Sequence, residues 1–101
     1  MHAVDKLPRA RRDLIDIWFY TAERWGEQQA DDYLYRLDAA IQHLAHHPFL
    51  GEDYIDVLKG YRRHSAGMHR IFYRVSRHRI EIVRVLHARM DFSDRLLSEE
   101  I

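Results

Sequence analysis

GYRRHSAGMHRIFYRVSRHRIEIVRVLHARMD, residues 60–91, is the stretch that decides the fold. It contains three β-compatible runs, at positions 61–64, 69–75 and 80–87. The connections between these runs are only a few residues long. They suffice for antiparallel neighbours but not for the crossover that parallel neighbours require. The stretch therefore predicts a small antiparallel sheet.

The positive charge of the chain is concentrated in this stretch. The 101 residues carry 16 basic and 16 acidic side chains, yet residues 58–90 hold nine Lys or Arg against a single acid, Glu81. The flanking residues, 1–57 and 91–101, are both acidic overall. Basic side chains protect sheet edges from aggregation, but an excess of nine to one is larger than that role needs. We therefore expect the sheet to bind something anionic.

Two helices are predicted ahead of the sheet, over residues 9–25 and 27–47. The apolar positions that recur at helical spacing in the first are Leu14, Ile17, Trp18, Thr21 and Trp25. Ile15 and Phe19 add a second apolar line to that helix. The corresponding stripe in the second helix is Ala30, Leu34, Leu37, Ile41 and Leu44. Gly26 alone separates the two helices, so they must fold back as an antiparallel hairpin.

The remaining segments give weaker signals. Residues 2–7 alternate weakly and suggest a first strand at an edge of the sheet, residues 49–59 indicate no conformation, and residues 91–101 suggest a short terminal helix. In the last run, simple alternation places Ile80, Ile82 and Leu86 on one face, and Glu81, Val83, Val85 and His87 on the other. The prediction is one α+β domain over residues 1–101, with the helical hairpin packed on one face of the antiparallel sheet.

Several kinds of site are not supported by the sequence. The chain has no cysteine, and its four glycines are too scattered for a nucleotide-binding loop. His43 lies at helical ligand spacing from His46 and His47, but no third ligand is evident. We interpret these histidines as surface residues and expect no metal or cofactor. We also expect a cytoplasmic protein with no membrane partner, because a signal peptide and an apolar run of about 18 residues are not recognisable.

Several segments together resemble the ParE branch of the ParE/RelE toxin superfamily, over nearly the whole chain. The most specific is RVLHARMD (84–91), followed by HPFLG (47–51), and they are supported by HRIFYRV (69–75) and Gly60-Tyr61-Arg62. The resemblance implies a toxin of a type II toxin–antitoxin module that is neutralised by a ParD-like antitoxin. Such a toxin inhibits DNA gyrase, and thereby replication, without being an enzyme. Two alternatives remain: a RelE-like ribonuclease that cuts messenger RNA on the ribosome, and a non-toxic module that only binds the antitoxin.

The resemblance also implies which residues meet each partner. Arg70 and Arg89 match arginines that RelE-like enzymes use around the scissile phosphate, but the late catalytic tyrosine has no counterpart, because no tyrosine follows Tyr73. A ribonuclease would use Arg62, Arg70, His87 and Arg89. From the residues alone, His87 is either a general base or a hydrogen-bonded structural histidine.

We expect the target to be contacted by Arg62, Arg63, Arg70, His87, Arg89 and Met90, with residues 91–101 as a modulator. We expect the antitoxin to be contacted by Trp18, Phe19, Arg74 and Arg84, and by an edge of the sheet. Sequence-specific DNA binding is not expected from this chain alone.

Overall fold

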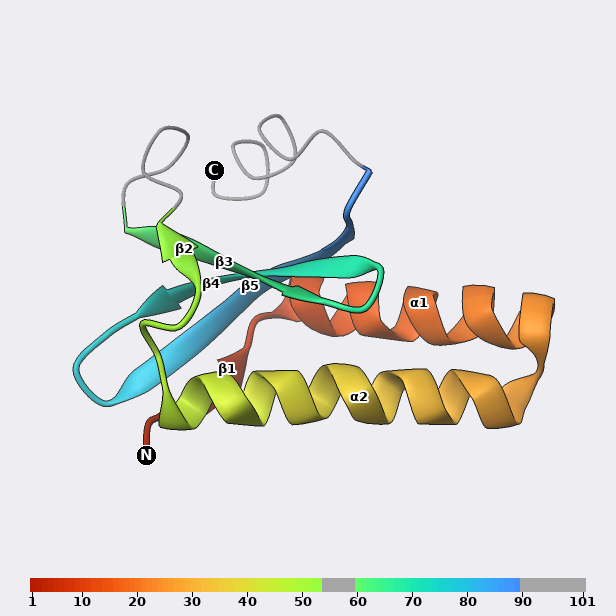
Figure 1. Ribbon diagram of the computed structural model, residues 1–101, viewed down its shortest axis with the longest axis horizontal. Helices are drawn as coiled ribbons and strands as arrows, with labels where there is room; N and C mark the ends of the chain where they lie inside the picture. The colour runs from red at the N-terminus through yellow and green to blue at the C-terminus, as the bar shows by residue number, and fades with distance from the viewer. Residues whose placement is uncertain (54–59, 90–101) are drawn as a thin grey trace.

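The computed structural model describes residues 1–53 and 60–89. In chain order the elements are β1 (Ala3–Lys6), α1 (Pro8–Trp25), α2 (Glu27–His46), β2 (Glu52–Asp53), β3 (Tyr61–Ala66), β4 (His69–Val75) and β5 (Arg79–His87). Figure 1 shows the two helices lying side by side and antiparallel along one side of the sheet. The predicted α+β class and helical hairpin are confirmed. Met90 and the expected terminal helix lie outside the described residues.

The sheet has five strands in the order β1-β5-β4-β3-β2. β3, β4 and β5 are antiparallel neighbours, as expected, and β2, which the sequence did not predict, pairs antiparallel with β3. β1 lies at an edge, also as expected, but it pairs parallel to β5, with Val4 opposite Ile80. Two helices and three strands separate β1 from β5, so no short turn forces these two strands to run in opposite directions. The sheet is therefore mixed.

Both helices bury the stripe that faces the sheet and leave much aromatic surface outside. The buried residues of the hairpin are Ala10, Ile17, Thr21, Ala30, Leu37, Ile41, Leu44 and Ala45. Gly26, at a φ of 93°, makes the reversal between the helices in a conformation that only glycine adopts readily. Trp25 was expected in the buried stripe, but it is 59% exposed. It is the last residue of α1, where the chain already turns away from the sheet. None of the helices in the described ranges is long and apolar enough to cross a membrane.

A β-bulge in β5 reverses the expected alternation of its side chains. Phe72 pairs with Arg84 while Tyr73 pairs with Ile82, so Val83 has no opposite residue in β4. The extra residue shifts the alternation by one position. Val85 consequently joins Ile80 and Ile82 in the core under the helices. Leu86 and Val83 instead pack with Tyr61 and Phe72 on the opposite face of the sheet. The prediction that Leu86 shares a face with Ile80 was therefore wrong.

A buried ion pair joins α1 to β5 beside this bulge. The Arg84 Nε and Nη2 donate to the two Asp13 carboxylate oxygens at 2.8 and 2.9 Å. The same carboxylate accepts the Val85 N–H at 2.9 Å. Pairing between β1 and β5 ends at Lys6 and Ile82, so Asp13 satisfies a backbone donor that lies beyond the end of β1. Arg84 is only 2% exposed, which makes it a structural residue of the interior.

Candidate functional site

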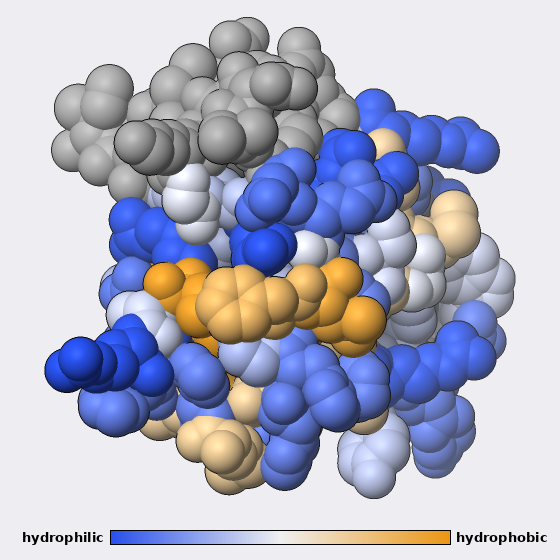
Figure 2. Space-filling view, turned by 60° about the vertical axis from the view of Figure 1, so that its left-hand side comes forward, coloured by the Kyte–Doolittle hydropathy of each residue, from blue (hydrophilic) through white to orange (hydrophobic). Residues whose placement is uncertain are grey.

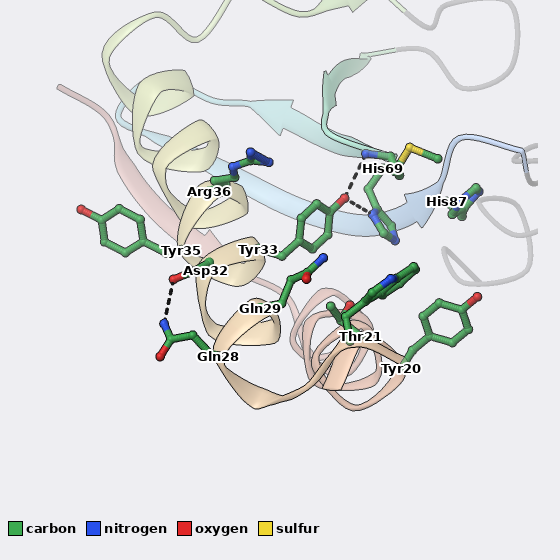
Figure 3. A pocket seen from close by; sticks show the side chains of 12 residues that line it. Tyr20, Thr21, Gln28, Gln29, Asp32, Tyr33, Tyr35, Arg36, His69 and His87 are labelled. Atoms are coloured by element: carbon green, nitrogen blue, oxygen red, sulfur yellow. Dashed lines mark hydrogen bonds between the residues drawn. The ribbon is translucent and has the colours of Figure 1, made fainter. Parts of the chain in front are cut away.

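A groove of about 1050 Å³ opens between the helical hairpin and the ends of the strands. The residues that line it are Tyr20, Thr21, Trp25, Gln28, Gln29, Asp32, Tyr33, Tyr35, Arg36, Met68, His69 and His87. Its rim is apolar and aromatic, because Tyr20, Trp25 and Met68 are all more than half exposed. In Figure 3, Tyr33 extends from α2 toward His69 across the groove, and Tyr20 and His87 lie at the same end of it. Exposed aromatic side chains on a concave surface are typical of protein-binding sites.

The floor of the groove is held by a fixed hydrogen-bond chain. The Met68 N–H donates to the Tyr33 hydroxyl at 3.0 Å, and that hydroxyl lies 2.6 Å from the His69 Nδ1. Tyr33 donates in this bond when the proton of His69 is on Nε2, and it accepts when that proton is on Nδ1. The pKa of His69 is lowered to about 4, mainly by burial and also by the neighbouring His87, while Asp13 opposes this shift. His69 is therefore neutral near pH 7 and joins α2 to the sheet.

A second, basic cleft continues from the groove past His87. It has a volume of about 830 Å³ and shares Tyr20, His69 and His87 with the groove. Arg12 and Arg89 line it as exposed cations. The His87 ring stands edge-on to His69, with centroids 5.4 Å apart, and its Nδ1 accepts the Arg89 N–H at 3.2 Å. His87 and Arg89 thus lie together, at the junction of an aromatic groove and a basic cleft.

The other residues expected at the target surface lie elsewhere. Arg62 donates to the Gly51 carbonyl, pairs with Asp53 and lies over the Phe49 ring. Arg70 bonds the Ser65 hydroxyl. The register of β3 with β4 puts Arg63 and Arg70 on the face of Phe72, away from the helices. The four residues named for a ribonuclease, Arg62, Arg70, His87 and Arg89, therefore do not converge on one point.

The residues expected at the antitoxin are also spread over the molecule. Trp18 is half-buried and donates its Nε1–H to Asp31 of α2 at 2.8 Å, with Phe19 packed edge-on against its ring. Arg74 pairs with Glu81 at 3.0 Å and lies over Tyr61. The burial of Arg84 against Asp13 removes its side chain from any surface that a partner would meet. Of this set, Phe19 at 63% exposed is the most accessible apolar residue.

The sequence did not indicate the groove. Its central contact joins Tyr33 to His69 across 36 positions, and no local pattern encodes such a pair. Tyr20 lies off the apolar stripe of α1, and Trp25 was assigned to the core. The one sequence feature that could have indicated an exposed aromatic groove was the aromatic content, 12% of the chain. The predicted buried stripes of the helices contain only some of these aromatic residues.

Comparison with known proteins identifies the family. Residues 4–92 match the family described as "ParE toxin of type II toxin-antitoxin system, parDE". Toxin ParE1 of Caulobacter vibrioides is 48% identical over 83 residues, which cover 82% of this chain and 85% of that protein. Toxin ParE1 of Mycobacterium tuberculosis is 44% identical over 90 residues, covering 88% and 92% of the two chains.

A solved structure shows the same fold. The structure titled "Chromosomal ParDE TA system from P. aeruginosa" contains a chain that superposes with a TM-score of 0.76 at 18% identity, covering 86% of this chain and 96% of that one. The family match spans almost all of the described residues and the two named relatives exceed 40% identity over most of their length. This chain therefore belongs to the ParE toxin family of type II toxin–antitoxin systems.

Proposed function

We propose that this chain is a ParE toxin that inhibits DNA gyrase by binding, in the cytoplasm, and that a ParD-like antitoxin neutralises it. The observation that carries the proposal is the aromatic groove that runs into a basic cleft at His87 and Arg89. The groove presents apolar rings, and the cleft presents cations, to a macromolecular partner. Family membership supports the toxin role, and the ParDE title of the solved structure supports an antitoxin partner.

Binding without catalysis is favoured by the arrangement of the polar groups. A phosphodiester-cleaving site needs a proton donor, a proton acceptor and cations around one phosphate. Neutral His69 has its Nδ1 occupied by Tyr33. Arg62 and Arg70 belong to opposite faces of the sheet, and neither lines the cleft that holds His87. Loss of positioned acid–base groups typically costs about 10²–10⁴ in rate.

For the antitoxin, we propose that an amphipathic segment with acidic residues occupies the groove and reaches the basic cleft. Trp25→Ala is expected to weaken antitoxin binding by about 30-fold or more, because a large aromatic anchor in a partner-covered groove is worth about 2 kcal/mol or more. Trp25 is exposed in the free chain, so the fold should be retained. Affinity is measured by calorimetry with the purified antitoxin.

Phe19→Ala is the matched control for that measurement. Phe19 lies on the same helix and is 63% exposed, but it is not among the residues that line the groove. A large loss with Phe19→Ala and none with Trp25→Ala would place the antitoxin on the outer line of α1, as first expected from the sequence, and contradict the groove proposal.

For the target, purified toxin is added to gyrase, relaxed plasmid and ATP, and supercoiling and linear DNA are followed on gels. We expect loss of supercoiling that added antitoxin reverses. Arg89→Ala should raise the toxin concentration needed for half inhibition about tenfold, because a charge-assisted contact contributes about 1.5–3 kcal/mol. Arg77→Ala also removes an exposed cation, but from the β4–β5 turn, and should change that concentration by less than about twofold.

Unchanged gyrase activity at a large molar excess of folded toxin would contradict the gyrase proposal. Messenger RNA cleavage on ribosomes that disappears in His87→Ala would then establish the ribonuclease alternative. Harmless expression in the absence of antitoxin would instead identify a module that only binds its partner.

A further inference from the structure

The end of α2 carries a pair of histidines that the proposed function does not use. His43 and His47 are four residues apart, and both are exposed. Figure 2 shows this end of the molecule, where an apolar band crosses between hydrophilic side chains. A shallow, open depression of about 630 Å³ lies here, lined by His43, His46, His47, Pro48, Phe49 and Leu50. Water therefore has free access to both imidazoles.

The backbone fixes the spacing of the pair. The His47 N–H donates to the His43 carbonyl at 3.0 Å, which closes a regular helical turn between them. Their ring centroids are 4.9 Å apart and the ring planes are tilted by 50°. His46 is exposed at the same helix end, but it makes no ring contact with either of them within the described part of the chain. The pair is therefore held by the helix, and the third histidine stands outside it.

This separation fits two imidazoles on one metal ion. A metal–nitrogen bond of about 2.0–2.1 Å places each ring centroid about 3.1–3.2 Å from the ion. Two such rings have centroids about 4.5 Å apart at a 90° ligand angle and about 5.2 Å apart at a tetrahedral angle. The observed 4.9 Å lies between these values.

The surroundings favour a cation of borderline softness. The carbonyl end of a helix carries partial negative charge, which attracts cations within the last turn. Imidazole nitrogen suits Zn²⁺, Ni²⁺ and Cu²⁺ and discriminates against Mg²⁺. The chain has no cysteine that would compete for such an ion. Among the described residues, no set of three or more His, Asp or Glu side chains is placed to hold a metal, so water must complete the coordination.

We infer that His43 and His47 form a two-imidazole site that binds one divalent transition-metal ion per chain. This site revises the interpretation of these histidines as plain surface residues. Because it occupies the far end of α2 from the groove residues Gln28 and Gln29, it is independent of the antitoxin and gyrase proposals. Metal bound there bridges the last turn of α2 to His47, the residue that follows the helix, and stabilises the folded state by mass action.

The test is titration of the full chain, free of any histidine tag, with NiCl₂ at pH 7.5, followed by calorimetry and by thermal unfolding. We expect binding of one Ni²⁺ and a saturable rise in melting temperature, with no rise for MgCl₂. His43→Ala and His47→Ala should each weaken Ni²⁺ binding at least tenfold. His46→Ala is the matched control, and it should bind Ni²⁺ within about twofold of the parent chain.

The following controls and outcomes decide whether His43 and His47 form the site. Melting curves in EDTA verify that every variant is folded, and His43→Gln replaces His43→Ala if the alanine variant is not. An equal loss in His46→Ala and His43→Ala would show diffuse binding to surface histidines and overturn the site. Ni²⁺ binding no stronger than Mg²⁺ binding in the parent chain would overturn it as well.

Discussion

Replacing Asp13 by alanine is expected to lower the free energy of unfolding by about 3–5 kcal/mol, because it leaves the buried guanidinium of Arg84 without its carboxylate. The partners are 2% and 11% exposed, so water cannot take over the lost interaction fully. The substitution also orphans the Val85 N–H at the open edge of β5. Urea unfolding followed by circular dichroism measures the loss.

Two variants separate this effect from a general change of charge. Asp16→Ala removes an exposed acid from the same helix and should change the unfolding free energy by no more than about 0.5 kcal/mol. The double variant Asp13→Leu, Arg84→Met removes both charges and should be less destabilised than Asp13→Ala, because no buried guanidinium has then lost its carboxylate. A double variant as unstable as Asp13→Ala would show that the damage comes from packing.

Gly51→Ala is expected to lower the free energy of unfolding by about 2–4 kcal/mol. The added methyl group would overpack its site and would disturb two hydrogen bonds at the same time. An added Cβ would lie 2.5 Å from the Tyr73 hydroxyl and 2.7 Å from the Arg63 carbonyl oxygen. That hydroxyl accepts the Gly51 N–H at 2.9 Å and donates to the Pro48 carbonyl at 2.8 Å. Pushing it aside therefore breaks the connection between the α2–β2 segment and the sheet. Chemical denaturation gives the magnitude.

Tyr73→Phe provides the companion measurement. Removing the hydroxyl takes away the nearest atom in the clash, so Gly51→Ala should cost less in the Tyr73→Phe background than in the parent chain. The conflict with the Arg63 carbonyl remains, and some destabilisation should persist. Strictly additive effects of the two substitutions would mean that the tyrosine does not mediate the strain.

The elements that follow local rules were predicted well from the sequence. Both helices begin and end within one residue of the predicted bounds. The spacing of their apolar residues, and the Gly26 and Pro48 that end them, can be recognised from residues close together in the sequence. The three strand runs and their antiparallel order follow in the same way from short connections. β1 was recognised as an edge strand, but its direction depends on a partner that lies some 75 positions later.

What the sequence could not predict depends on long-range contacts. The bulge at Val83 is decided by the fit between β4 and β5, and alternation along β5 alone cannot reveal it. Arg84 was assigned to a surface because arginine is rarely buried. Its burial depends on Asp13, which is 71 positions away. The groove likewise exists only once Tyr33 meets His69.

The parallel pairing of β1 with β5 has a consequence for how the protein is made. A chain leaves the ribosome from its first residue onward, and the helical hairpin can assemble early from contacts that are close in sequence. The first strand must wait for its only neighbour within the described sheet, β5, which is synthesised after both helices and the other three strands. The edge of the sheet and the Asp13–Arg84 ion pair therefore form only after β5 has been synthesised.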